Sequence, residues 1–273
     1  MRQSTRVTRR PLLGDDASAL AAVVAAGAHG VYVHNALAAG EGEGTVFEHA
    51  GSVSGLCWFG PRGNLVLIAS EPAESAIETA MTDAVARARM PWRIAMGPAA
   101  IVNALRERAA KNPLLLRDQV YYAGTAASAA KELALAEARL AQRADRDRLV
   151  QATLLLNASD LNIEPSRVDR RWLRDSIDQR IAEGATWVVG PVGSLQCKLD
   201  CGSDGPGGRM LEGVFTFPEM RGRGLAGALV ASCLQSAPGP VCLHVGMHNA
   251  PARAAYERAG MAVVGRCRLL LFG

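Results

Sequence analysis

The stretch Val214–Gly227, which reads VFTFPEMRGRGLAG, constrains the fold of this 273-residue chain more than any other. Its first four residues are β-branched or aromatic and predict a strand, which Pro218 ends because proline lacks a backbone N–H. Gly222 and Gly224 allow a turn, and apolar residues at helical spacing predict a helix from Leu225. A helix start directly after a turn that carries two arginines predicts an anion site, because unpaired N–H groups and the positive end of the helix dipole meet there.

Two phosphate-binding patterns fit this turn. Gly222, Gly224 and Gly227 match the dinucleotide fingerprint G-x-G-x-x-G, but that fingerprint needs an acidic residue about 20 positions further on. The corresponding stretch, Val241–Val245, has no acidic residue, and too little chain follows for further βαβ units. The second pattern, R/Q-x-x-G-x-G/A, is matched by Arg221, Gly224 and Ala226 as they stand. An ordinary strand-to-helix turn remains the third interpretation.

Length and composition narrow the class of protein. At about 100–200 residues per domain, 273 residues indicate two domains. A hydrophobic content of 49% and a charged content of 21% exclude a disordered chain. The net charge of +4 suits an anionic small ligand and does not argue for nucleic acid. No apolar run reaches the roughly 18–20 residues that a membrane span needs.

The six cysteines form no C-x-x-C pair, and no histidine cluster completes a metal site. Most of them lie in apolar strand or helix patterns, which is typical of buried, reduced thiols. This usage predicts a cytoplasmic protein that holds no metal.

The expected elements repeat along the chain. Residues 1–125 are expected to form two helices, three strands, a helix, a strand, a helix and a strand. Residues 143–273 are expected to form the same elements in the same order. Residues 70–74 (SEPAE) are expected to open the third helix of the first half, which runs to about Arg89. Residues 126–142 are either a linker, a short helix or the start of the next first strand. The order predicts two copies of one α/β fold in tandem.

Three pieces of residues 143–273 match one family in order: Leu211–Glu219 as a strand ending in proline, Arg221–Ala226 as an acyl-CoA turn, and Asn249–Gly260 as the pattern N-x-x-A-x-x-x-Y-x-x-x-G. This part resembles a GNAT (GCN5-related) N-acetyltransferase domain. The whole chain resembles bacterial tandem-GNAT proteins whose first half has lost the turn, since Ala69–Glu74 has neither arginine nor a glycine pair. The resemblance implies an α/β (α+β) fold of two GNAT-like domains, each with a central mixed, mostly antiparallel sheet flanked by helices.

The resemblance also implies site residues. Acetyl-CoA would be bound by Phe215, Thr216, Phe217, Arg221, Gly222, Arg223, Gly224, Leu225, Ala226, Gly227 and Asn249. The two phenylalanines would act through their main chain, while their side chains are expected in the core. Tyr256 is the candidate general acid, because a phenol with a pKa near 10 can protonate a departing thiolate. Glu212 is a possible general base, and its apolar strand is expected to raise its pKa. It could equally be a surface carboxylate, and Tyr256 a core residue.

Two classes of function remain open. The first is an acyltransferase that uses one acetyl-CoA per chain to acetylate a small-molecule or peptide amine. The second is a binding or regulatory protein that senses acyl-CoA without turnover or uses its first half to bind a partner. Asn249 is expected to cap the last helix in either case, because asparagine favours the N-cap and Pro251 follows in the first turn.

Overall fold

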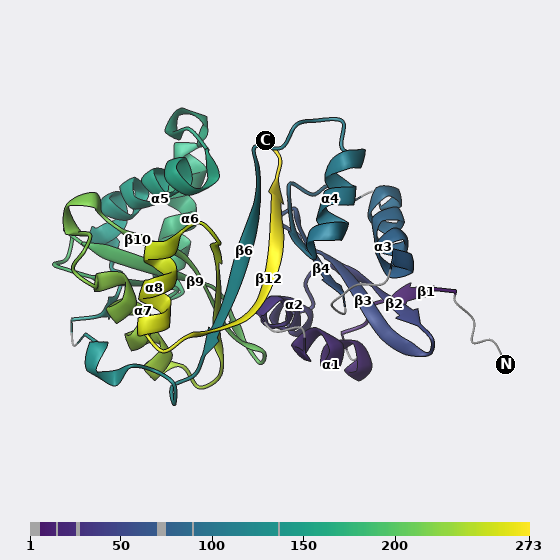
Figure 1. Ribbon diagram of the computed structural model, residues 1–273. Coiled ribbons are helices and arrows are strands. Elements are labelled where there is room, and N and C mark those ends of the chain that lie inside the picture. The colour runs from purple at the N-terminus through teal and green to yellow at the C-terminus, as the bar shows by residue number, and fades with distance from the viewer. Residues whose placement is uncertain (1–5, 15, 26–27, 70–74, 89, 136) are drawn as a thin grey trace. The chain divides into compact units, whose positions relative to one another are not determined.

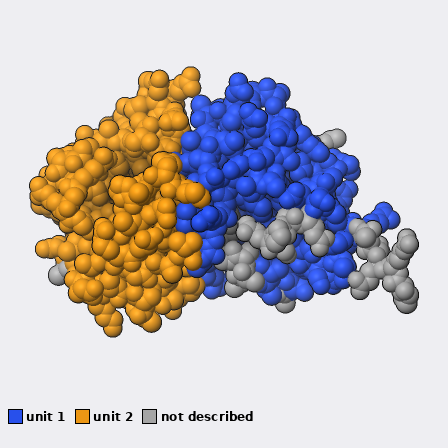
Figure 2. Space-filling model, in the orientation of Figure 1, with its two compact units in different colours: residues 1–121, 205–207, 264–273 blue, residues 122–204, 208–263 orange. Residues whose placement is uncertain are grey.

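The computed structural model describes residues 6–14, 16–25, 28–69, 75–88, 90–135 and 137–273. These residues form two compact units, shown in different colours in Figure 2. Unit 1 comprises residues 1–121, 205–207 and 264–273, and unit 2 comprises residues 122–204 and 208–263. The strands β6 (Leu115–Gly124), β9 (Cys197–Gly205) and β12 (Ala262–Leu271) each contribute residues to both units, so neither unit is a continuous segment of the sequence.

The element order confirms the predicted internal repeat. The same order of elements occurs twice along the chain, first ending at β6 and then ending at β12 (Figure 1). It consists of a strand, two helices, three strands, a helix, a strand, a helix and a strand. The first copy contains β1 (Thr8–Pro11), α1 (Ala17–Ala25), α2 (Ala28–Ala38), β2 (Glu43–His49), β3 (Ser52–Phe59), β4 (Asn64–Ala69), α3 (Ser75–Arg87), β5 (Ile94–Gly97), α4 (Ala99–Arg108) and β6. The second contains β7 (Arg139–Leu140), α5 (Arg146–Leu161), α6 (Arg170–Ala182), β8 (Thr186–Val189), β9 (Cys197–Gly205), β10 (Gly208–Thr216), α7 (Leu225–Ser236), β11 (Val241–Gly246), α8 (Ala250–Arg258) and β12.

Unit 1 is a sheet with helices on both faces. Its strands β1 to β4 are antiparallel neighbours, β4 and β5 are parallel, and β5 pairs with the antiparallel residues Arg268–Leu271 of β12. Alternate residues of β2 to β4 contribute to two apolar clusters, one with α3 and α4 and the other with α1 and α2. This follows from the period of two in a strand, which places successive side chains on opposite faces. The helix predicted to open at residues 70–74 begins at Ser75, and the opening itself lies outside the described residues.

Unit 2 is built in the same way on the strand order β11-β10-β9-β8-β7. The pairs β7–β8 and β8–β9 are antiparallel, whereas β10 and β11 are parallel. One face of this sheet packs against α5 and α6 through an apolar cluster that includes Leu149, Ile177 and Val188. The predicted α/β (α+β) class, with helices flanking mixed and mostly antiparallel strands, is therefore confirmed. Residues 126–142, left open as linker, helix or strand, contain one 3-10 turn (Lys131–Leu133) and the short strand β7.

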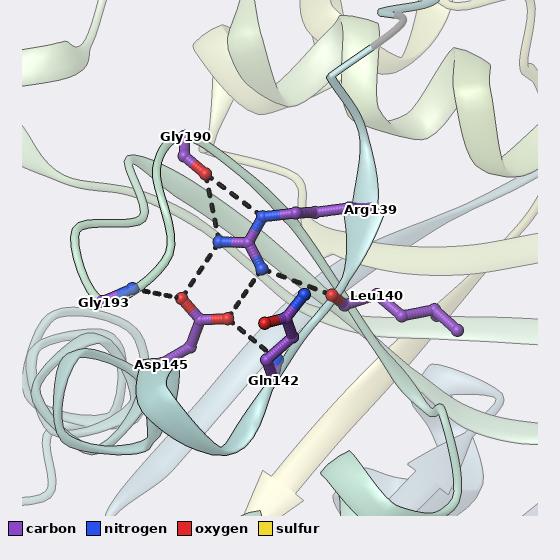
Figure 3. Close-up of polar contacts among 6 residues, drawn as sticks. All are labelled: Arg139, Leu140, Gln142, Asp145, Gly190 and Gly193. Carbon is purple, nitrogen blue, oxygen red and sulfur yellow. Dashed lines mark hydrogen bonds and ion pairs between the residues drawn. The ribbon is translucent and has the colours of Figure 1, made fainter.

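A buried carboxylate holds the start of α5 (Figure 3). The side chain of Asp145 is 0% exposed and accepts two hydrogen bonds from the Arg139 guanidinium, at 2.7 and 3.0 Å. It also accepts the backbone N–H groups of Gln142 and Gly193, both at 2.8 Å. Burial by itself would raise the pKa of Asp145, but these four hydrogen bonds stabilise its charged form and lower the pKa below its ordinary value. The network connects β7, α5 and the loop that follows β8.

Candidate active site

The strands β10 and β11 separate partway along their length. Their parallel register runs from Arg209 opposite Val241 to Leu211 opposite Leu243, whereas β10 continues to Thr216 and β11 to Gly246. The register therefore leaves the β11-facing edge of residues 213–216 without a paired strand. An extended ligand can bind to such an edge by main-chain hydrogen bonds.

Gly213 changes which side chains of β10 share a face. Its φ of +60° lies in the left-handed region, and a Cβ at this position would lie 2.6 Å from the Asp200 carboxylate. Strict alternation would place Glu212 and Phe215 on opposite faces. In the structure Glu212 pairs with Arg180 of α6, and Phe215 packs in the cluster that contains residues of α5 and α6. The irregularity at Gly213 thus brings a carboxylate and the apolar core residues to one face.

The turn after β10 presents its backbone to solvent. Gly222 and Gly224 both have φ of +76°, and no atom lies within 4 Å of where a Cβ would be. Gly224 is the N-cap of α7 and offers no side-chain acceptor to the N–H groups of the first turn. Gly227 has a different role, because its Cβ would lie 3.0 Å from the Ala255 carbonyl, so it permits the close packing of α7 on α8. The predicted strand, turn and helix start are confirmed, and the site has the geometry of an anion-binding helix N-terminus.

Both arginines of this turn are exposed. Arg221 Nε donates to the Thr216 carbonyl at 3.2 Å, and its guanidinium lies 5.9 Å from the centroid of the Phe215 ring. Among the described residues, Arg223 has no hydrogen-bond or ion-pair partner, so its guanidinium is available to an anion. The rings of Phe215 and Phe217 are 5% and 1% exposed and pack edge-to-face at 5.2 Å, as expected of core side chains.

Tyr256 lies in α8 and is 5% exposed. Its hydroxyl has no hydrogen-bond partner among the described residues. Burial raises its pKa well above the ordinary value, and the nearby acidic groups of Cys197 and Asp160 act in the same direction. The phenol therefore keeps its proton at neutral pH and has no competing acceptor, which are the properties of a proton donor.

A second tyrosine packs against the first. The ring of Tyr122, from β6, meets the Tyr256 ring edge-on with 6.0 Å between centroids. Its hydroxyl donates to Glu257 Oε1 at 2.7 Å and accepts from Arg253 Nε at 3.2 Å. Sequence reasoning missed Tyr122, because it placed this strand in the first half. Asn249 caps α8 as predicted, with Oδ1 accepting the Ala252 N–H at 3.2 Å.

The predicted apolar surroundings of Glu212 are wrong. Its side chain is 39% exposed, and Oε1 accepts a hydrogen bond from Arg180 at 2.9 Å. The same guanidinium donates to Asp200 at 2.9 Å, and Asp200 also binds Lys198 Nζ and Thr186 Oγ1. Glu212 is thus one end of a charged network. The sequence signal for this network was the pair Lys198 and Asp200, which stand at alternate positions in the otherwise apolar stretch Cys197–Cys201.

Comparison with known proteins relates part of the chain to one family. Residues 151–261 match the family model "Acetyltransferase (GNAT) family". No curated protein matches the chain. Solved structures match almost all of it. A GCN5-related N-acetyltransferase from Sphaerobacter thermophilus has a TM-score of 0.55 and 17% identity, covering 98% of this chain and 95% of that one. An acetyltransferase of the GNAT family from Colwellia psychrerythraea has a TM-score of 0.53 and 12% identity, with 97% and 100% covered.

At these identities the structures show the fold alone. The family-model match thus covers residues 151–261, and the structures show the GNAT fold over almost all of the chain, a fold that supports acyl transfer. Within the described residues, no helix is long and apolar enough to cross a membrane. The same residues contain no group of three or more side chains suited to hold a metal ion.

Proposed function

We propose that this protein is an N-acetyltransferase that moves an acetyl group from acetyl-CoA to a primary amine on a small molecule or peptide. The observation that carries the proposal is the combination found in unit 2. An uncapped helix start with an exposed glycine turn follows directly on the unpaired edge of β10. The buried Tyr256, whose hydroxyl is unengaged among the described residues, comes from α8, which packs on α7.

The residues present fit acetyl-CoA. Arg221, Arg223 and the amides of residues 222–227, including those of Leu225, Ala226 and Gly227, would bind the pyrophosphate, because N–H groups and guanidinium ions both favour a phosphate dianion. The main chain of Phe215, Thr216 and Phe217 would pair with the pantetheine arm along the free edge of β10. Asn249, already the cap of α8, would hold its far end.

One acetyl-CoA per chain is proposed, bound at residues 215–227. The corresponding junction of the first half includes Ser70, Glu71 and Glu74, which lie outside the described residues. Its sequence has no arginine and no glycine pair, and its acidic side chains would repel a pyrophosphate. Calorimetry tests this stoichiometry directly, because two equivalent sites would contradict the proposal.

Acetyl-CoA supplies the acetyl group as a thioester. In the proposed mechanism Tyr256 gives its proton to the departing sulfur, while Glu212 or a water molecule accepts the proton that the amine loses. Positioned acid and base groups of this kind contribute on the order of 10²–10⁴-fold to the rate. Arg180 holds Glu212 in place through the hydrogen bond at 2.9 Å.

One observation favours the alternative, a non-catalytic protein that binds acyl-CoA for regulation or interaction. The candidate base Glu212 already forms an ion pair with Arg180, which is itself shared with Asp200. A screen of amine acceptors with acetyl-CoA, read as release of free thiol, decides between the two. Turnover that requires both an acceptor and Tyr256 supports the enzyme. Tight CoA binding without thiol release from any acceptor would support the alternative.

A further inference from the structure

One guanidinium group of α5 contacts the segment that joins β10 to the glycine turn. The side chain of Arg148 is 25% exposed, and its Cζ lies 3.3 Å from the centroid of the Phe217 ring. Its Nη2 donates to Glu219 Oε1 at 2.7 Å. Its Nη1 donates to Gln151 Oε1 at 2.8 Å, and its Nε donates to the Leu195 carbonyl at 3.4 Å. Every nitrogen of this guanidinium therefore has an acceptor within unit 2.

The two side chains that Arg148 contacts in this segment stand on either side of Pro218. Phe217 is 1% exposed, and its main chain is proposed to pair with the pantetheine arm. Glu219 lies in a 3-10 turn that leads directly into Arg221, the first arginine of the glycine turn. A guanidinium that holds a ring and a carboxylate two positions apart restricts the chain between them. It thereby restricts the direction in which the glycine turn leaves the sheet.

Glu219 places a negative charge next to a site that is proposed to hold a pyrophosphate. Its side chain is 58% exposed and stands two positions before Arg221. By charge alone, such a carboxylate would weaken the binding of an anion. Its ion pair with Arg148 offsets this charge, and the charge-assisted hydrogen bond gives the carboxylate a structural role in the turn.

We propose that Arg148 is a positioning residue for acetyl-CoA, which acts through Phe217 and Glu219 and not by touching the cofactor. It holds the end of β10 and the start of the glycine turn in the conformation that binds the cofactor. A site that is ordered before its ligand arrives avoids the cost of ordering on binding, so its affinity is higher. The inference rests on the proposed function, because it concerns the same acetyl-CoA site, and it adds to that site a residue from a different helix.

The test is calorimetry of CoA with the full chain and its variants, at a temperature at which circular dichroism shows all of them folded. Arg148→Met removes the guanidinium and should raise the Kd for CoA about five- to tenfold. Arg148→Lys keeps a charge that can reach Glu219 but has no planar group to cover Phe217, so its Kd should lie between those of the wild type and Arg148→Met. In turnover with acetyl-CoA, Arg148→Met should act on KM far more than on kcat.

Glu219→Met separates positioning from charge. If Glu219 acted by its charge alone, loss of the carboxylate beside the pyrophosphate would tighten CoA binding. Because Glu219 also links Arg148 to the turn, we expect its loss to raise the Kd instead. The double variant Arg148→Met/Glu219→Met should bind CoA about as weakly as Arg148→Met, because two side chains that act as one unit have non-additive effects.

Arg146→Met is the matched control. Arg146 belongs to the same helix, and its guanidinium forms an ion pair at 3.0 Å with Asp178 of α6 and not with the turn. This variant also loses an arginine of α5 and an ion pair, and its Kd for CoA should stay that of the wild type. An equal rise of the Kd in Arg146→Met and Arg148→Met would show a general loosening of α5 and would overturn the inference.

Other outcomes distinguish this inference from the proposed function. An unchanged Kd in Arg148→Met, or tighter binding in Glu219→Met, would overturn the positioning role, while weaker binding in Arg221→Ala/Arg223→Ala would still support the proposed site. A wild-type chain that binds no CoA would overturn the proposed function and this inference with it. If Arg148→Met does not fold, the direction of the change in Glu219→Met decides the matter by itself.

Discussion

Replacing Tyr256 with phenylalanine removes one hydroxyl and keeps the ring that packs on Tyr122. If Tyr256 protonates the departing thiolate, kcat falls by about 10²–10⁴-fold. At 1.36 kcal/mol for each factor of ten, this loss corresponds to about 3–5 kcal/mol of activation free energy. The affinity for CoA is expected to stay unchanged, because the hydroxyl acts only when the thiolate departs.

Tyr256→Phe is expected to lower kcat without lowering the stability of the folded protein. The Tyr256 hydroxyl has no hydrogen-bond partner among the described residues, so its removal leaves no donor or acceptor of the protein unsatisfied. Tyr256→Phe should therefore leave the free energy of unfolding unchanged or raise it. The raised pKa adds a pH signature. Above about pH 10 the unfolded tyrosine ionises while the folded one keeps its proton, so the wild type loses stability there and the variant lacks this loss.

Tyr122→Phe is the matched control, because the two rings are in contact but, within the described part of the chain, only the Tyr122 hydroxyl has hydrogen-bond partners. Removal of the Tyr122 hydroxyl leaves Glu257 Oε1 and Arg253 Nε without this hydrogen-bond partner, which should lower the free energy of unfolding by about 1–3 kcal/mol. Its kcat should change little. Tyr256→Phe is thus expected to lose activity while it keeps its stability, and Tyr122→Phe is expected to lose stability while it keeps its activity.

The assay is thiol release at saturating acetyl-CoA and acceptor, with single-turnover measurements to isolate the chemical step. Chemical denaturation of the same samples gives the stability. Full kcat in Tyr256→Phe, under conditions where chemistry limits the rate, would show that Tyr256 is a packing residue. A large loss of stability in this variant would show that its hydroxyl is engaged in the folded protein, and would refute the reasoning from its lack of a partner.

Three further changes test other parts of the structure. The double substitution Arg221→Ala/Arg223→Ala should weaken CoA binding by about 10–100-fold in calorimetry, since each charge-assisted hydrogen bond contributes measurably to affinity; undiminished binding would place the site elsewhere. Glu212→Gln should reduce kcat less than Tyr256→Phe, and the defect should shrink as pH rises toward the pKa of the amine; a defect independent of pH would exclude Glu212 as the base. Asp145→Asn should cost about 3–5 kcal/mol near pH 7. Because the pKa of Asp145 is lowered in the fold, its contribution is present above the unfolded pKa of about 3.9 and is lost as pH falls through the folded value, so melting curves of the two proteins should converge in acid.

Several features of this protein follow from the sequence because short-range rules govern them. Pro218 ends β10 since it lacks an N–H, Gly222 and Gly224 take up positive φ, and Asn249 caps α8 with its own side chain. The repeat of element order also follows from local periodicity, and it is present in the structure. Each of these features depends on residues within a few positions of one another.

Only the tertiary structure decided which distant side chains meet. The left-handed Gly213 moves Phe215 to the face that Glu212 shares with Arg180, although strict alternation predicts the opposite face. Likewise Tyr122 reaches Tyr256 from a strand more than a hundred residues earlier. No local pattern encodes these contacts. They arise because burial of the apolar faces sets where each strand and helix packs, and the charged and aromatic side chains come together as a result.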